Sequence, residues 1–331
     1  MPMAMSNPLA ALLNQKEVVI ADGAMGTNLF QLGLEDGACA ELWNVDHPDR
    51  LETVHRSFVS AGSDILLTNT FSANRYRLAM HGLEHRVAEL NIAGARVARS
   101  VAGSVDRPVI VAGDMGPIGD MLEPVGTRTA SEAEEAFFEQ AQALKEGGVD
   151  IAWIETLFAD EELDAAVRAL QRAGLAYVAT MTFDTGGFTM MGIHPEAAMR
   201  RVRRLEWKPI AFGANCGVGP SQLLDSVLGL ARGAEDELAV VAKSNCGVPV
   251  VAENMEVTYN GTPQAMATYA CLARDAGARI IGGCCGTTAG HIRAMVEALE
   301  ARPRAMPPSC EDIERKLGPF TITGKPAAIG Q

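Results

Sequence analysis

Residues 109–114 and 151–155 read VIVAGD and IAWIE, and each run is apolar until it reaches an acidic residue. Near-continuous Val, Ile and Ala in such a short run is typical of a strand buried on both faces of a parallel sheet. Six further runs share the pattern: VVIAD (18–22), ILLTN (65–69), AYVATMT (176–182), IAFGANC (210–216), AVVAKS (239–244) and ARIIGGC (278–284). The sequence therefore predicts eight parallel strands.

Helical segments separate these runs. The clearest is Glu132–Glu146, where Ser131 and Glu134 fit a capping box and Gly147–Gly148 ends the helix. The others cover roughly residues 50–61, 84–101, 160–173, 195–205, 222–231, 263–276 and 291–301. Eight strands alternating with helices predict a single α/β domain, a (β/α)₈ TIM barrel, over residues 15–301. An open doubly wound sheet is the competing architecture, but no G-x-G-x-x-G motif follows the first strand.

The composition changes after Arg302. Residues 302–331 contain Pro303, Pro307, Pro308 and Pro319 and show no sustained period. We expect an extended C-terminal tail that wraps the barrel or a partner subunit, and through which the chain forms a homo-oligomer.

Charge and cysteine content narrow the function classes. The net charge of −13 argues against nucleic acid or an anionic membrane surface as a partner. The sequence has no apolar run long enough to span a membrane and no basic residue before Lys16, so neither a membrane span nor a secretory signal is expected. Seven cysteines, an odd number, argue against a disulfide framework and for reduced thiols in a cytoplasmic protein.

Barrel enzymes carry their reactive groups at the carboxyl ends of the strands. In this sequence, three of these ends place cysteines at one rim: Cys216, Cys246 and the vicinal pair Cys284-Cys285. Three thiolates with one open position would suit Zn²⁺, and a thiol bound there would be ionised yet still nucleophilic. Buried structural cysteines and a redox pair are the alternatives that the spacing leaves open.

Six motifs, in order along residues 15–300, resemble the homocysteine S-methyltransferase family. They are DGAMGTNL (22–29), LTNTFSAN (67–74), GPIGDMLEP (116–124), WIET (153–156), GANCGVGP (213–220) and GGCCGTT (282–288). The resemblance implies a (β/α)₈ barrel with Zn²⁺ held by Cys216, Cys284 and Cys285. It also implies that Asp22, Gly23 and Glu155 hold the amino-acid end of homocysteine. Cys246 lies outside the family pattern and is expected to pack at the rim.

The methyl donor is less sharply indicated. The family includes betaine-, S-methylmethionine- and cobalamin-dependent members, and betaine is the first expectation for this chain. An onium donor would lie against aromatic faces. Trp43 matches a tryptophan of betaine-using members, and Asn69, Phe71 and Tyr76 follow the second strand. The tyrosines that those members carry after the second and fourth strands are Ser72 and Thr156 here.

Other donors and other classes of protein stay open. Another sulfonium, or a methyl-corrinoid carried by a separate protein, would also supply the methyl group. A zinc-dependent barrel hydrolase or lyase would use Asp22 and Glu155 as acid and base, and would act without a thiol. A non-enzymatic protein that binds zinc or partners a corrinoid protein would show no turnover with homocysteine.

Overall fold

The computed structural model describes residues 7–235, 237–251 and 257–320. Within these residues, eight parallel strands form one sheet in the order β1-β10-β7-β6-β5-β4-β3-β2. An isolated parallel bridge between Ala21 and Ile65 joins its two end strands and closes the barrel. The strands are β1 (Val19–Ile20), β2 (Ile65–Leu67), β3 (Ile110–Met115), β4 (Ile151–Leu157), β5 (Tyr177–Met181), β6 (Ala211–Cys216), β7 (Ala239–Ser244) and β10 (Ala278–Gly283).

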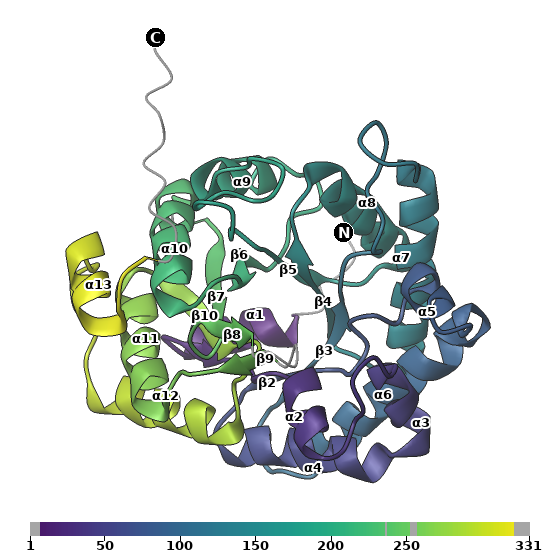
Figure 1. The fold of residues 1–331 in the computed structure, drawn as a ribbon, viewed down its shortest axis with the longest axis horizontal. Coiled ribbons are helices and arrows are strands. Elements are labelled where there is room, and N and C mark those ends of the chain that lie inside the picture. The colour runs from purple at the N-terminus through teal and green to yellow at the C-terminus, as the bar shows by residue number, and fades with distance from the viewer. Residues whose placement is uncertain (1–6, 236, 252–256, 321–331) are drawn as a thin grey trace.

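An outer ring of helices surrounds the strands, which confirms the predicted (β/α)₈ barrel (Figure 1). Among the described residues the ring consists of α4 (Pro48–Ser60), α6 (Val87–Ala102), α7 (Ala130–Gly147), α8 (Asp160–Ala173), α9 (Pro195–Val202), α10 (Pro220–Ala234), α11 (Pro263–Asp275) and α12 (Ala289–Ala301). None of the helices described is long and apolar enough for a bilayer crossing.

The predicted cap of the helix after the third strand is wrong. The helix α7 begins earlier, and its N-cap is Thr129 rather than Ser131. Thr129 is extended, its backbone N–H donates to the Glu132 carboxylate at 2.8 Å, and its hydroxyl accepts from the Glu132 N–H at 3.2 Å. Two overlapping S/T-x-x-E patterns compete here, and Arg128, 3.4 Å from Glu132, supports the earlier one.

Two apolar layers make up the core. One lies between the strands and the outer helices, and the other fills the inside of the barrel, where Trp153, Val241 and Ile280 meet. The inner layer is closed at one end by α1 (Pro8–Gln15), whose Leu9, Leu12 and Leu13 are buried against it. Burying each leucine contributes about 1.5–3 kcal/mol, so α1 seals the amino-terminal end of the barrel firmly.

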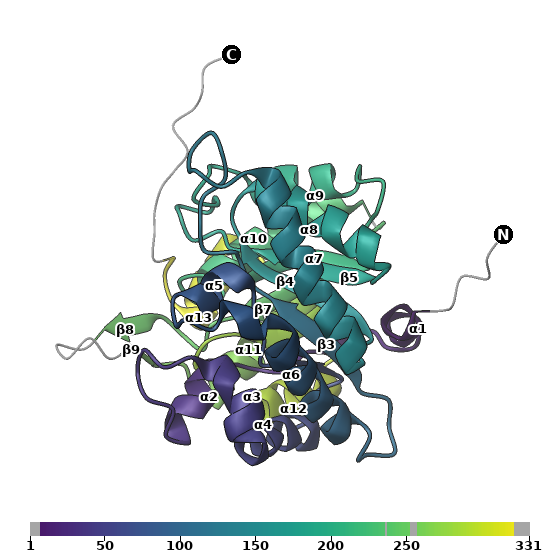
Figure 2. The same ribbon diagram turned by 90° about the vertical axis from the view of Figure 1, so that its right-hand side faces the viewer.

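The opposite end of the barrel carries the shorter elements. They are α2 (Gly26–Gln31), η1 (Ala40–Leu42), α3 (Trp43–Asp46), α5 (Arg75–Ala79), η2 (Glu84–Arg86) and the antiparallel hairpin of β8 (Pro249–Val251) and β9 (Val257–Tyr259). Figure 2 shows α1 and the hairpin at opposite ends of the molecule. The strand pattern did not indicate the hairpin, because its strands are short and lie outside the barrel sheet.

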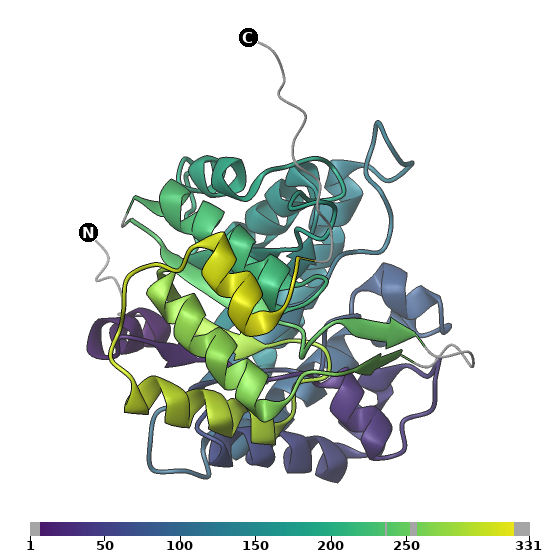
Figure 3. The ribbon, with the colours of Figure 1, turned by 60° about the vertical axis from the view of Figure 1, so that its left-hand side comes forward.

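Residues 302–320 differ from the extended tail that we expected. They include the helix α13 (Cys310–Leu317), which lies across α10 and α11 (Figure 3). A capping box between Ser309 and Asp312 starts this helix, and Ile313 is fully buried beneath it. The apolar contact of α13 spans a single turn, which is too short to give a recognisable hydrophobic period in the sequence. The remaining residues of the predicted tail, 321–331, lie outside the described residues, and its part in a homo-oligomer stays a prediction.

Candidate active site

Three cysteine sulfurs meet at the carboxyl rim of the barrel. Cys216 is the last residue of β6, and Cys284 and Cys285 follow β10 directly. The three Sγ atoms all lie within 4.8 Å of one another. Within the described residues, no other group of three or more His, Cys, Asp or Glu side chains meets at this spacing. We call Cys216, Cys284 and Cys285 the sulfur cluster.

Residues at the end of β7 and just after it hydrogen-bond to Cys284 and Cys285 and fix their backbone. The Cys284 N–H donates to the Ser244 carbonyl at 2.6 Å, and the Cys285 N–H donates to Asn245 Oδ1 at 3.0 Å. The Cys285 carbonyl accepts from the Cys246 N–H at 2.8 Å. These bonds turn the chain just after the strand, so neighbouring cysteines that would otherwise point to opposite faces reach one point.

Cys246 lies outside the sulfur cluster. Its Sγ is 3.2 Å from the Gly261 carbonyl oxygen and 3.2 Å from His291 Nε2. Burial raises the pKa of its thiol to about 11. Its contacts are those of a residue that packs the rim.

Asn215, next to Cys216 of the sulfur cluster, hydrogen-bonds to residues of β4 and β5. Its Oδ1 accepts from the Thr156 N–H at 2.9 Å and from the Thr180 hydroxyl at 2.7 Å, and its Nδ2 donates to the Thr156 hydroxyl at 2.8 Å. Thr156 and Cys216 have φ values of 66° and 62°, in the left-handed region that non-glycine residues rarely adopt. Such strain persists only where surrounding contacts enforce it, and it is concentrated at functional sites.

Hydrogen bonds within the cluster favour the thiolate form of one sulfur. Hydrogen bonds from Cys216 and Cys284 lower the pKa of Cys285 to about 3, and the Tyr259 hydroxyl adds a further hydrogen bond. The same bonds raise the pKa of Cys216 above its ordinary value. Tyr259 comes from β9 of the unpredicted hairpin, so no pattern in the sequence indicated its place beside the cluster.

A layer of buried charge lies inside the barrel beside the sulfurs. Lys243 Nζ is 3.2 Å from Glu155 Oε2 and 3.9 Å from Asp22 Oδ1, and it lies 5.3 Å from the centre of the Trp153 ring. Asp114 belongs to the same layer, because the charges of Glu155, Lys243 and Asp22 all act on it. We call Asp22, Asp114, Glu155 and Lys243 the charged layer, and all four are buried.

Burial and mutual charge shift every pKa in the charged layer. Burial raises the pKa of Asp22 to about 7, although Lys243 and a hydrogen bond from the Leu67 N–H oppose this. Burial also raises the pKa values of Glu155 and Asp114. For Lys243, burial favours the neutral amine, but Glu155 and Asp22 outweigh it and raise the pKa. Lys243 is therefore a cation in the folded chain.

Sequence reasoning did not assign Lys243 or Asp114 to the site. A signal was present, since AVVAKS places a lysine inside a strand that is otherwise buried on both faces. Gly23, which we expected near the amino-acid end of the substrate, lies beside Asp22. A Cβ there would come within 2.7 Å of the Thr287 carbonyl and 2.8 Å of the Phe58 ring, so only glycine fits.

The residues proposed for the donor have other partners. Trp43 is buried, with its ring 4.9 Å from that of His47 and the Arg50 guanidinium 4.7 Å above it. Asn69 uses its amide to donate to the Ala40 carbonyl and to Asn44, each within 3 Å. These are the contacts of residues that anchor loops, and a donor role for Trp43 and Asn69 stays a prediction.

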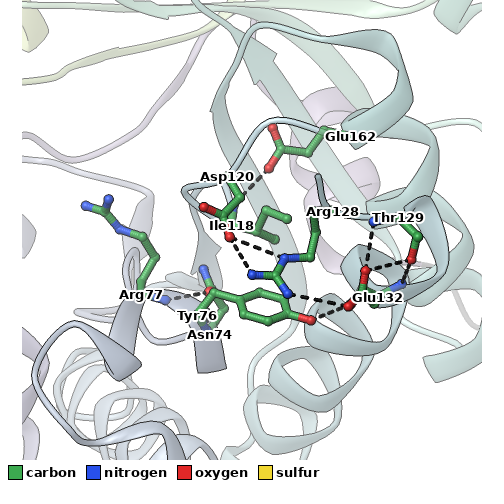
Figure 4. Close-up of polar contacts among 9 residues, drawn as sticks. All are labelled: Asn74, Tyr76, Arg77, Ile118, Asp120, Arg128, Thr129, Glu132 and Glu162. Carbon is green, nitrogen blue, oxygen red and sulfur yellow. Dashed lines mark hydrogen bonds and ion pairs between the residues drawn. The ribbon is translucent and has the colours of Figure 1, made fainter. Parts of the chain in front are cut away.

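Two further aromatic rings lie in the segment after β2. Phe71 is half-buried and fits against Gly116, where an added Cβ would come within 2.6 Å of its ring. The ring of Tyr76 has the Arg128 guanidinium 4.0 Å from its centre, and Arg128 is held in turn by Asp120 at 2.7 Å (Figure 4). We call Trp43, Phe71 and Tyr76 the loop aromatics; arginine covers a face of two of them.

Comparison with known proteins agrees with this geometry. The Homocysteine S-methyltransferase family model matches residues 19–299. The chain is 36% identical over 308 residues to methionine synthase of Mycobacterium tuberculosis (strain ATCC 25618 / H37Rv) and 33% identical over 300 residues to that of Mycobacterium leprae (strain TN). These alignments cover 88% and 86% of this chain but only 25% and 24% of the relatives, so the chain spans about a quarter of their length.

Solved structures share the fold. The homocysteine methyltransferase MmuM from Escherichia coli matches with a TM-score of 0.74 in its oxidized form and 0.73 in its metallated form, at 23% identity. These matches cover 88% and 87% of this chain and 99% of each MmuM chain. The family model covers most of the chain and therefore defines the class of protein to which it belongs. The chain belongs to the homocysteine S-methyltransferase family, as its motifs indicated.

Proposed function

We propose that the chain transfers a methyl group to the sulfur of homocysteine and forms methionine, with zinc as its cofactor. The observation that carries this proposal is the sulfur cluster, with three Sγ atoms within 4.8 Å at the carboxyl rim. A set of three thiolates suits zinc better than magnesium or calcium, which prefer oxygen ligands. When bound by Cys216, Cys284 and Cys285, zinc would keep the acceptor thiol ionised at neutral pH.

The chain's own residues would orient the acceptor thiol and the methyl donor. The charged layer beside the cluster fits the charged end of an amino acid whose thiol lies at the rim, with Asp22 and Glu155 supplying negative charge. The acceptor sulfur forms the new bond to the methyl carbon as the bond from that carbon to the donor breaks. The bonding electron pair leaves with the donor, and no proton of the methyl group moves. The rate then comes chiefly from thiolate formation and from orientation of the two reactants.

Betaine remains the donor to test first, with Trp43 and Phe71 as its proposed contacts. A methylated corrinoid carried by another protein or another module is the second candidate, ahead of S-methylmethionine or another sulfonium. Two observations favour the corrinoid as second candidate. Arginine covers a face of Trp43 and of Tyr76, where an onium group would otherwise lie, and the curated relatives are named methionine synthases.

A donor panel tests the proposal. Zinc-loaded protein and L-homocysteine would be incubated with betaine, S-methylmethionine or methylcobalamin, and methionine would be quantified. We expect methionine from one of these donors and none with Cys284→Ser. Turnover of a substrate without any thiol would indicate the hydrolase or lyase class. Zinc binding without methionine from any donor would indicate a non-enzymatic protein.

A further inference from the structure

Two strained strand ends beside the sulfur cluster share one hydrogen-bonding partner. In the described part of the chain, the non-glycine residues with positive φ are Thr156, Cys216 and Glu235. Thr156 is β-branched, so its φ of 66° is a genuine outlier. Asn215 precedes Cys216 in the chain and hydrogen-bonds Thr156 twice, at 2.9 Å through Oδ1 and at 2.8 Å through Nδ2. One side chain therefore connects both left-handed residues of the site.

The left-handed residue at the end of β6 changes the direction of a thiol. Along β6, Ala211 belongs to the inner apolar layer, whereas Phe212 and Ala214 belong to the layer between strands and helices. Because side chains alternate along a strand, a regular β6 would point Cys216 toward the helices, as it does Phe212 and Ala214. The Cys216 Sγ nevertheless lies within 4.8 Å of the other two sulfurs of the cluster. The left-handed turn at Cys216 accounts for this change of direction.

The end of β4 has a matching irregularity. Its pairing with β5 shifts register between Ile154 and Leu157, and Thr156 lies within the shift. Ile154 and Leu157 both belong to the layer between strands and helices, although residues three apart in a regular strand face opposite sides. A bulge at Thr156 explains how both reach the same layer.

Asn215 is held firmly enough to fix both strand ends. It is 0% exposed, and its Oδ1 also accepts from the Thr180 hydroxyl of β5 at 2.7 Å. Its Nδ2 lies 3.9 Å from Cys284 Sγ, a weak N–H···S contact. The carboxamide thus reaches from β6 past β5 to β4, with both its oxygen and its nitrogen bonded. A buried polar group whose bonds are all satisfied makes its surroundings rigid.

We propose that Asn215 is a positioning residue that aims the Cys216 thiol, because it holds the ends of β4 and β6 in their left-handed conformations. This inference rests on the proposed function, since the thiol is aimed at the zinc that the sulfur cluster would bind. Asn215 supplies no ligand of its own and acts through the backbones of Thr156 and Cys216. Groups that orient metal ligands typically contribute about 10–100-fold to metal affinity.

Zinc affinity tests this role. Metal-free wild type, Asn215→Ala and the control Asn91→Ala would be titrated with zinc in competition with a coloured chelator, and their thermal melts would be compared. Asn91 is an equally buried asparagine on α6, whose amide donates to the Ala73 and Val87 carbonyls. Asn215→Ala should weaken zinc binding about 10–100-fold. Asn91→Ala should lower the melting temperature and leave zinc affinity unchanged.

Two further variants separate positioning from a general loss of stability. Thr156→Gly removes the cost of the left-handed conformation, because glycine adopts it freely. The loss of zinc affinity caused by Asn215→Ala should therefore be smaller when Thr156→Gly is also present. Thr180→Val removes one hydrogen bond to Asn215 and serves if Asn215→Ala does not fold. It should weaken zinc binding by less than the Asn215 variant but measurably.

The outcomes distinguish this inference from the proposed function. Wild-type zinc affinity in folded Asn215→Ala would overturn the positioning role, and so would wild-type affinity in Thr180→Val if Asn215→Ala does not fold. An equal loss with and without Thr156→Gly would also overturn it, because Asn215 would then act independently of Thr156. If wild type itself bound no zinc, the proposed function would fail.

Discussion

The charged layer and the loop aromatics both lie toward the carboxyl end of the barrel, but they are built in opposite ways. In the charged layer, Asp22 and Asp114 each keep a buried oxygen that has no hydrogen-bond partner in the described part of the chain, and the neighbouring Thr156 and Cys216 have strained backbones. Among the loop aromatics, Trp43 and Tyr76 are each covered by an arginine, and Phe71 packs on Gly116.

This difference separates a binding site from its scaffold. Unsatisfied groups and strain reduce stability and persist where a ligand completes them, whereas satisfied groups stabilise the chain as it stands. On this reasoning the proposed acceptor site is built into the barrel itself. The contacts of the loop aromatics stabilise the rim of the barrel.

The largest effect is expected from the sulfur cluster. Cys284→Ser should lose its zinc and reduce methionine formation to background, because a hydroxyl stays protonated and binds zinc poorly. Metal content by mass spectrometry and methionine formation by chromatography measure the two losses. Cys246→Ser is the matched control and should keep one zinc per chain. Full zinc occupancy in Cys284→Ser would remove the cluster from the proposal.

The next effect concerns the only cation of the charged layer. Lys243→Met should lower the free energy of unfolding by about 3–5 kcal/mol, because it leaves buried carboxylates without a counter-charge. Urea unfolding of the ligand-free protein measures this. The double variant Lys243→Met/Glu155→Gln removes the pair together and should regain much of the loss. If Lys243→Met were as stable as wild type, the carboxyl groups would be neutral and the comparison with the loop aromatics would fail.

A pH effect of moderate size follows from Asp22. Its pKa is raised to about 7 by burial, against Lys243 and with Glu155 and Asp114 nearby. Above pH 7 the carboxylate is ionised and can pair with an ammonium. Below it, the affinity for homocysteine should fall up to about tenfold per pH unit, as for any binding that requires a deprotonated group. Calorimetric titration between pH 5.5 and 8 (roughly the range around this pKa) would reveal the fall. A parallel fall for γ-mercaptobutyrate, the analogue of homocysteine without an amine, would assign it to the thiol instead.

The smallest effect is expected from the arginines that cover the loop aromatics. Arg50→Ala removes the guanidinium above the Trp43 ring and should lower the free energy of unfolding by about 0.5–1 kcal/mol. If Trp43 only anchors its loop, the KM for betaine should stay within about twofold of wild type, a change of less than 0.5 kcal/mol in binding. Arg128→Ala, which uncovers Tyr76, is the matched variant. A selective decrease in the betaine KM in either would show that the ring face binds the donor.

The barrel could be predicted from the sequence because its cause is local. Runs such as VIVAGD and IAWIE are apolar on both faces, so they must be buried between helices, and their order along the chain leaves few topologies. The same order places Cys216, Cys284 and Cys285 at one rim before any distance is known. In contrast, the capping box of α7 was misplaced, because two S/T-x-x-E patterns overlap there and the sequence does not show which of them caps the helix.

Contacts between distant strands were decided only by the tertiary structure. Lys243, Asp114 and Glu155 come from three strands, and no spacing shows that one cation faces several carboxyl groups. Tyr259 reaches Cys285 from a hairpin too short to carry a pattern, and Ile313 anchors α13 with a single turn. The sequence alone indicates which side chains of a strand share a face, since strand periodicity is local. Which of them find hydrogen-bond partners depends on three-dimensional packing, because those partners come from strands that are distant in the sequence.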